Sequence, residues 1–188
     1  MPKYSDLSKK IIFDLAVVGV ITIAATSPFF LINIANFLIK NRKHFKREYD
    51  KHKIAKAFER LKRGRLIILS EKEGKFKIEL TEKGKRKFEE IKFDDMAIKI
   101  PLKWDKKWRI IIFDIPEKQY KRARNALREK LQKIGFYQLQ KSVWVNPYPC
   151  EKEIQFLCEF FDVNRFVNII TADKIYNDII LRKYFELL

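Results

Sequence analysis

The clearest helical pattern in the chain lies between Glu48 and Arg63. Apolar residues in this segment recur with the spacing i, i+3, i+4 and i+7, which places them on one face of a helix. Basic residues occupy the remaining faces, and Gly64 follows at the position where helices commonly end. The segment is therefore predicted to be an amphipathic helix with a buried apolar face formed by Ile54, Ala57, Phe58 and Leu61.

The residues after this helix predict a β-hairpin followed by a second helix. Leu66–Leu69 is a short apolar strand, Ser70–Gly74 is a turn, and Lys75–Leu80 alternates strictly between polar and apolar positions. The sequence Leu-Thr-x-x-Gly, from Leu80 to Gly84, then opens a helix that runs to about Ile91. A basic helix, a hairpin and a further helix in this order predict a winged helix-turn-helix domain, in which the helix would enter the major groove of DNA.

The C-terminal half shows an equally regular order of elements. Trp108–Asp114 is an almost continuous apolar run and predicts a central strand that is buried on both faces. The elements that follow are predicted to be a helix at Glu117–Ile134, strands at Phe136–Gln140 and Ser142–Asn146, a helix at Glu151–Phe161, a strand at Arg165–Thr171 and a helix at Ile175–Leu187. This βαββαβ order is typical of ferredoxin-like domains.

The predicted fold is therefore of the α+β class, with an N-terminal winged helix-turn-helix followed by a ferredoxin-like domain. The expected boundaries are residues 1–92 for the winged-helix-like domain, which includes apolar N-terminal helices, and residues 108–188 for the ferredoxin-like domain. Residues 93–107 form a linker, in which Pro101 prevents a continuous helix.

The N-terminal segment permits two interpretations. Leu15–Ile39 holds 25 residues without a charge, which is long enough for a transmembrane helix that would anchor the protein to a membrane. The preferred interpretation is a pair of helices in a soluble core, Leu7–Ala25 and Pro28–Asn41. Ser27 can cap the second helix, and a proline suits its first turn. Asn33 would be costly in lipid.

The charge of the chain points to a polyanionic partner. Lys and Arg number 41 against 24 Asp and Glu, which gives a net charge of +17. The segment Lys40–Arg65 carries 12 basic and three acidic residues, whereas residues 108–188 carry a net charge of only +4. DNA binding is thus expected in the N-terminal half, although a solvated helix face remains an alternative. The candidate nucleic-acid-binding residues are Lys51, Lys53, Lys56, Arg60, Lys62, Arg63, Lys72 and Lys75.

Cysteine and histidine chemistry is not indicated. Cys150 and Cys158 are eight residues apart, and the two histidines, His44 and His52, lie in the basic region. This spacing is unlike that of a zinc site, and the histidine positions argue against a Ser-His-Asp triad. Two unpaired thiols fit the reducing cytoplasm, and both are expected to be small buried hydrophobic residues on a helix.

Two motifs of the C-terminal half carry a resemblance to a known family. The segment Trp108–Glu117 has the sequence WRIIIFDIPE, and Gln138–Val145 has the sequence QLQKSVWV. Together they resemble the Cas-two-like domain of PaaX-type transcriptional repressors, and also the CRISPR-associated Cas-two endonucleases. The PaaX resemblance implies a homodimer that binds operator DNA through its winged helices. The expected partner is double-stranded DNA, the C-terminal domain is expected to join the two copies, and no cofactor is expected to be needed for binding.

The resemblance to Cas-two nucleases implies a second function class. In those enzymes an aspartate at the end of the first strand binds a metal ion, and Asp114 stands at that position. Asp114 would then be the catalytic residue and the Mg²⁺ ligand of an endonuclease, or the protein would hold DNA as a CRISPR adaptation factor. The competing interpretation is structural, since Asp114 and Glu117 have the spacing of a capping box, with Pro116 just inside the helix.

Overall fold

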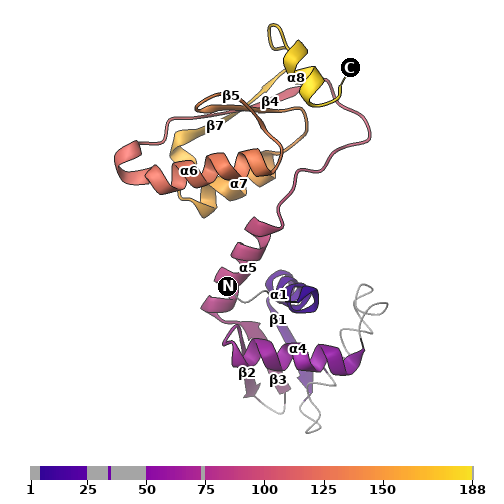
Figure 1. The fold of residues 1–188 in the computed structure, drawn as a ribbon. Helices are drawn as coiled ribbons and strands as arrows, with labels where there is room; N and C mark the ends of the chain where they lie inside the picture. Colours follow the sequence, from indigo (N-terminus) through magenta and orange to yellow (C-terminus); the bar gives the residue numbers. More distant parts are fainter. Residues whose placement is uncertain (1–4, 25–33, 35–49, 73–74, 188) are drawn as a thin grey trace. The chain divides into compact units, whose positions relative to one another are not determined.

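The structure, a computed structural model, describes residues 5–24, 34, 50–72 and 75–187. The chain divides into two compact units, Met1–Asp94 and Asp95–Leu188. Each unit combines helices with one antiparallel sheet, so the fold is mixed α and β (Figure 1).

The first unit is built on a three-stranded sheet with the strand order β1-β3-β2. Strand β3 is the central strand and pairs with β1 on one side and with β2 on the other. Strands β1 and β3 are neighbours in the sheet although they are far apart in the sequence. The described elements of this unit are α1 (Asp6–Val18), β1 (Val20–Ala24), α4 (Lys51–Arg63), β2 (Ile67–Lys72), β3 (Lys75–Leu80) and α5 (Glu82–Asp94).

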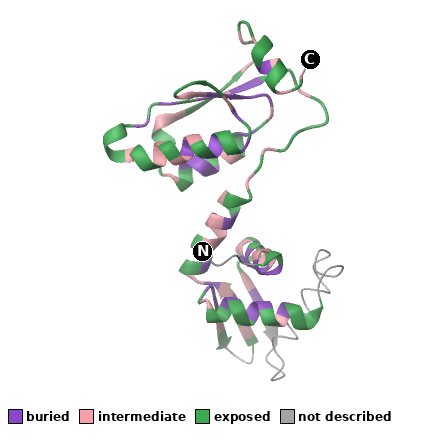
Figure 2. Ribbon diagram, viewed as in Figure 1, coloured by how far each residue is buried: buried purple, intermediate pink, exposed green. Residues whose placement is uncertain are grey.

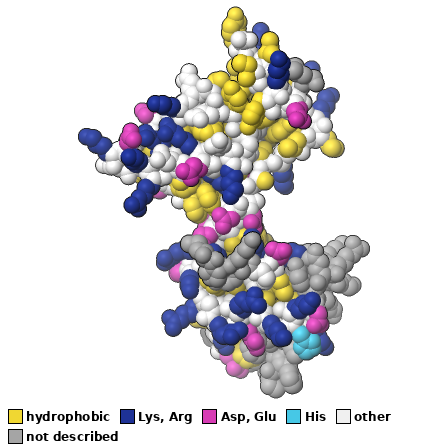
Figure 3. Space-filling view, in the orientation of Figure 1, with side chains coloured by type: hydrophobic (Ala, Val, Ile, Leu, Met, Phe, Trp, Pro, Cys, Tyr) yellow, Lys and Arg dark blue, Asp and Glu magenta, His cyan; other side chains and the backbone are white. Residues whose placement is uncertain are grey.

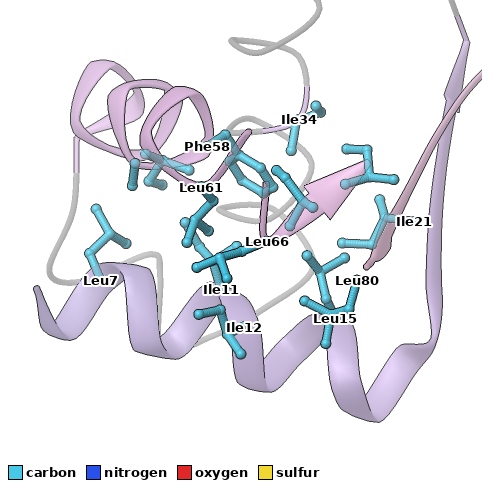
Figure 4. Close-up of a cluster of buried hydrophobic side chains, with 14 of the residues drawn as sticks. Leu7, Ile11, Ile12, Leu15, Ile21, Ile34, Phe58, Leu61, Leu66 and Leu80 are labelled. Carbon is cyan, nitrogen blue, oxygen red and sulfur yellow. The ribbon is translucent and has the colours of Figure 1, made fainter. Parts of the chain in front are cut away.

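Apolar side chains from α1, α4 and the sheet form the core of the first unit (Figure 4). Helix α1 contributes Ile11, Ile12 and Leu15, each at most 1% exposed, and α4 contributes Phe58 and Leu61. Burial of one such side chain contributes about 1.5–3 kcal/mol to stability. The predicted apolar face of the basic helix is therefore confirmed, and it positions α4 on the core.

The N-terminal helix is shorter than the predicted Leu7–Ala25. Helix α1 ends at Val18, because Gly19 adopts a φ of +77° and donates its N–H to the carbonyl of Leu15. The next residues are mostly β-branched, which favours strand geometry, and Val20–Ala24 forms β1. The predicted second helix, Pro28–Asn41, lies outside the described residues apart from Ile34, which is buried.

The proposed membrane span begins inside this region. Its first residues, from Leu15 to Ala24, are divided between the end of α1 and strand β1. Within the part of the chain that the structure describes, no helix combines the length and the apolar character that crossing a bilayer requires.

The second unit follows the predicted order of elements. Its four-stranded antiparallel sheet has the order β5-β6-β4-β7, with β4 in the interior, and α6 and α7 lie on one side of it (Figure 1). This is the split βαβ arrangement. The elements are β4 (Trp108–Phe113), α6 (Glu117–Lys133), β5 (Tyr137–Gln140), β6 (Val143–Asn146), α7 (Glu151–Phe160), a 3₁₀ turn (Asn164–Phe166), β7 (Val167–Ala172) and α8 (Ile179–Tyr184).

Strand β4 is fully buried on one face and only partly buried on the other, so the prediction of two buried faces is wrong for the second face. On one face, Arg109, Ile111 and Phe113 are all buried. Figure 2 colours the ribbon by burial and shows buried residues on the sheet and the helices of this unit. On the opposite face Trp108 is buried, but Ile112 is 36% exposed. The reason is that the C-terminal residues pack only on the Trp108 end of this face, through Leu181 and Phe185.

The buried Arg109 side chain holds the segment that leads into β4. Its guanidinium donates hydrogen bonds to both carboxylate oxygens of Asp105, at 2.8 and 2.6 Å, and to the carbonyl of Pro147 at 3.0 Å. These hydrogen bonds from Arg109 keep the pKa of the Asp105 carboxyl below its ordinary value. Because the carboxylate is partly exposed, its contribution to stability is modest.

This pair predicts an acid-dependent loss of stability. A carboxyl group whose pKa is lowered by folding stabilises the protein above its unfolded pKa of about 4, and this contribution disappears as the pH falls through the lower folded value. We expect Asp105→Asn to lower the urea midpoint of the second unit at pH 7. The difference from wild type should then narrow as the pH falls below about 4. A difference that stays constant over this range would contradict the assignment.

Candidate nucleic-acid interface

Helix α4 separates its apolar and basic side chains completely. Ile54, Ala57, Phe58 and Leu61 are each at most 4% exposed, whereas all six basic residues predicted on this helix are exposed. The helix begins at Lys51 rather than at Glu48, which lies outside the described residues. The core therefore fixes the orientation of the helix and turns its cations toward the solvent.

The six cations do not form a single group. Lys53, Lys56, Arg60 and Arg63 follow the spacing i, i+3, i+7 and i+10, which places them along one stripe of the helix. We call these four residues the basic stripe. Lys51 and Lys62 fall outside it, on the flank beside the buried face, because a helix turns by about 100° per residue. Figure 3 shows Lys and Arg side chains gathered over this part of the first unit.

Three residues of the basic stripe also line a depression of about 410 Å³ beside the start of α1. Lys53, Lys56 and Arg60 form one wall, and Ser5 and Asp6 form the other. Ser5 and Asp6 were not among the residues singled out from the sequence. They precede α4 by more than 40 residues, and no local spacing pattern connects the two segments.

The hairpin β2–β3 is joined firmly to the end of α4. Arg65 takes a left-handed φ of 55°, and its carbonyl accepts a hydrogen bond from the Thr81 hydroxyl at 2.7 Å. The Thr81 N–H donates to the carbonyl of Leu66 at 3.0 Å, and the Lys83 ammonium donates to the carbonyl of Gly64 at 2.9 Å. We call this set of hydrogen bonds the Thr81 joint.

The Thr81 joint explains the Leu-Thr-x-x-Gly pattern. The Thr81 hydroxyl accepts a hydrogen bond from the Gly84 N–H at 3.0 Å and so caps the start of α5. A Cβ atom at Gly84 would lie 2.0 Å from the carbonyl oxygen of Leu66. Glycine is therefore required for the close approach of α5 to the chain that leaves α4.

The two candidate lysines of the hairpin lie at the end remote from this joint. Strand β2 continues to Lys72, so the turn is shorter than the predicted Ser70–Gly74, and Lys72 and Lys75 are register partners in the sheet. The Lys75 side chain is exposed. Lys77 forms an ion pair with Glu79 at 2.9 Å, which offsets part of its charge.

Asp114 is exposed at the end of β4, in the second unit. Its N–H donates to the carbonyl of Phe166 at 3.0 Å, and α6 begins only at Glu117 with Pro116 as its N-cap residue. The capping-box interpretation of Asp114 is therefore wrong. Among the described residues, no three Asp, Glu, His or Cys side chains lie close enough together to hold a metal ion.

Two arginines lie over aromatic rings near the end of β4, those of Phe113 and Phe166. The Arg128 guanidinium lies 5.8 Å from the centre of the Phe113 ring, and Arg165 lies 4.7 Å from the centre of the Phe166 ring. Partial burial, followed by repulsion from Arg124, lowers the pKa of Arg128.

The two cysteines are buried, as predicted. Cys150 is 1% exposed and Cys158 is 4% exposed, and both thiols are free. Burial raises the pKa of the Cys150 thiol to about 12 and that of Cys158 to about 11. Thiols with such pKa values are inert at neutral pH, so these residues serve packing.

Comparison with known protein families finds a match within the second unit. Residues 101–179 match the family model of the PaaX protein central Cas2-like domain. The matched segment includes every strand of the four-stranded sheet. No curated protein sequence matches the chain. The resemblance that the WRIIIFDIPE and QLQKSVWV motifs indicated is thus confirmed for this domain.

Proposed function

Because residues 101–179 match the model of the PaaX central Cas2-like domain, we propose that the protein is a transcriptional regulator that binds double-stranded DNA as a homodimer. In this proposal the first unit contacts DNA and the second unit holds two copies together. Binding requires no cofactor, since the contacts are made by the protein's own cations and polar groups.

The basic stripe of α4 carries the proposal. Its four cations are exposed, share one line of the helix, and form no ion pair with any residue that the structure describes. A solvated surface helix commonly mixes charges of both signs, with pairs at i, i+4. Unpaired cations along one stripe instead suit the phosphates that border a DNA groove.

The architecture of the first unit supports a winged helix. The order α1, β1, α4, β2, β3 and the sheet order β1-β3-β2 place a basic helix immediately before a two-stranded hairpin. In this geometry α4 would lie in the major groove, while Lys72 and Lys75 of the hairpin would reach phosphates. The helix expected before the turn of the motif would lie within residues 25–49, largely outside the described part.

The open face of the second sheet supports the homodimer. Ile112 is 36% exposed and Ile170 is 44% exposed, and the register of β4 with β7 places both on the face that α6 and α7 leave open. A second copy packed on this face would bury these side chains. A symmetric dimer would also set the distance between the two DNA half-sites.

A titration of DNA binding against salt tests the proposal. Wild-type protein should bind a mixed-sequence duplex with an affinity that falls steeply as salt rises. The four cations of the basic stripe alone account for a slope of about −3.6 in log affinity against log salt per copy, or about −7 for a dimer. Absence of duplex binding at low salt, or an affinity that salt does not change, would refute the proposal.

The endonuclease alternative is tested in the same samples. With Mg²⁺ or Mn²⁺ added, the wild type and Asp114→Ala should bind duplex equally and leave single- and double-stranded substrates intact. Cleavage by wild type that is lost in Asp114→Ala would instead establish Asp114 as a metal ligand of a nuclease.

A further inference from the structure

The first unit contains a hollow of about 720 Å³ that the DNA-binding proposal does not use. The end of α1, the last residues of β3 and one face of α5 form its walls. Its volume falls within the range of about 300–1,000 Å³ that is typical of small-molecule sites. The hollow lies at the end of the sheet remote from the hairpin turn, since its wall includes Glu79 and Leu80.

The floor of the hollow is apolar. Leu15 and Leu80 belong to the core of the unit, and Phe88 packs edge-to-face on Phe13 with ring centres 4.9 Å apart. Ile68 also lines the hollow, although 48% of its surface is exposed. A hydrocarbon group placed here would remove the exposed part of Ile68 from water, which favours binding.

The rim of the hollow is acidic, in a protein with a net charge of +17. Three carboxylates, of Glu79, Glu82 and Glu89, line it together with one ammonium group, of Lys85. Glu82 and Lys85 form an ion pair at 2.7 Å, and Glu79 pairs with Lys77 at 2.9 Å. The surplus of negative charge therefore rests on Glu89.

Glu89 is half-buried and has no ion pair or hydrogen bond with any residue that the structure describes. Glu82, Lys85 and Glu89 follow the spacing i, i+3 and i+7 on α5, so they share the face that borders the hollow. A carboxylate that is partly withdrawn from water beside an apolar floor gains from a cationic partner.

We propose that this hollow binds an apolar ligand that carries one positive charge. The hydrocarbon part lies against Ile68 and Phe88, and the ammonium group is held by Glu89. The proposal goes beyond the proposed function, because the ligand is recognised without DNA and on residues outside the basic stripe.

Calorimetric titration of the full chain with hexylammonium tests the proposal, with hexanoate and hexanol as probes of equal length. Hexylammonium should bind saturably in the millimolar range, and hexanoate at least about tenfold more weakly. Glu89→Gln should weaken hexylammonium binding about tenfold. The matched control is Glu90→Gln, because Glu90 pairs with Lys87 and does not line the hollow; it should change the affinity less than about twofold.

A second pair of variants tests the apolar part. Ala16→Phe, which places a ring in the hollow, should abolish binding of hexylammonium and hexanol alike. If its unfolding midpoint shows that this variant does not fold, Ile68→Gln replaces it, because the exposed Ile68 tolerates a polar side chain. Equal binding of hexylammonium and hexanoate, equal effects of the two glutamine variants, or no saturable binding of hexylammonium would each overturn the proposal. None of these results depends on whether the protein binds DNA.

Discussion

Simultaneous replacement of Lys53, Lys56 and Arg60 by glutamine is expected to lower the affinity for duplex DNA about 100-fold or more at 0.1 M salt. Each lost phosphate contact removes the release of about 0.9 counterion, so the slope of log affinity against log salt should become shallower by about 2.7 per protein copy. Fluorescence anisotropy of a labelled duplex at several salt concentrations measures both quantities. The fold should be unaffected, because the three side chains are exposed.

The matched control removes the same charge from the second unit. Lys152, Lys174 and Lys183 are exposed and form no ion pair with the described residues. Their replacement by glutamine lowers the net charge of the chain equally, from +17 to +14. If this control weakens DNA binding as much as the triple variant of α4 does, the overall charge rather than the basic stripe determines affinity.

Gly84→Ala is expected to destabilise the first unit by about 3 kcal/mol. The new methyl group would lie 2.0 Å from the Leu66 carbonyl oxygen, so α5 or the chain after α4 must move. That movement would also break the hydrogen bond from the Thr81 N–H to Leu66. Urea-induced unfolding, followed by far-UV circular dichroism, measures the change in the free energy of unfolding.

Gly64→Ala provides the control for this substitution. Gly64 has a φ of −71°, which alanine adopts readily, and its nearest non-neighbouring atom would be 3.3 Å from an added Cβ. We expect a change within about 1 kcal/mol. If Gly84→Ala is tolerated as well as Gly64→Ala, the close approach of α5 to Leu66 is not a requirement of the fold.

Elements whose signal is local were predictable from the sequence. The buried residues of α4 repeat with helical spacing, and Lys75–Leu80 alternates as a half-buried strand does, so both elements were predicted with nearly the observed bounds. The βαββαβ order of the second unit was predictable for the same reason. Residue type and spacing carry this information without any long-range contact.

The remaining features depend on contacts between distant segments. The uncharged residues from Leu15 to Ala25 predict the continuation of a helix, but residues 20–24 form β1, whose strand geometry is stabilised by pairing with β3, more than 50 residues later. The partial exposure of Ile112 depends on how far the C-terminal residues extend over the sheet. The division of the α4 cations into a stripe and a flank could have been predicted, since it follows from their spacing alone.

The Thr81 joint has a consequence for the thermodynamics of recognition. A helix and a hairpin that are held together before the partner arrives lose little conformational freedom when they dock, so most of the contact energy is retained as affinity. The association should accordingly behave as the meeting of two preformed surfaces, without the large loss of entropy that accompanies folding on binding. Thr81→Val keeps the shape of the side chain but removes the hydroxyl that donates to the Arg65 carbonyl. The variant would therefore introduce that entropic cost while every cation of the basic stripe stays in place.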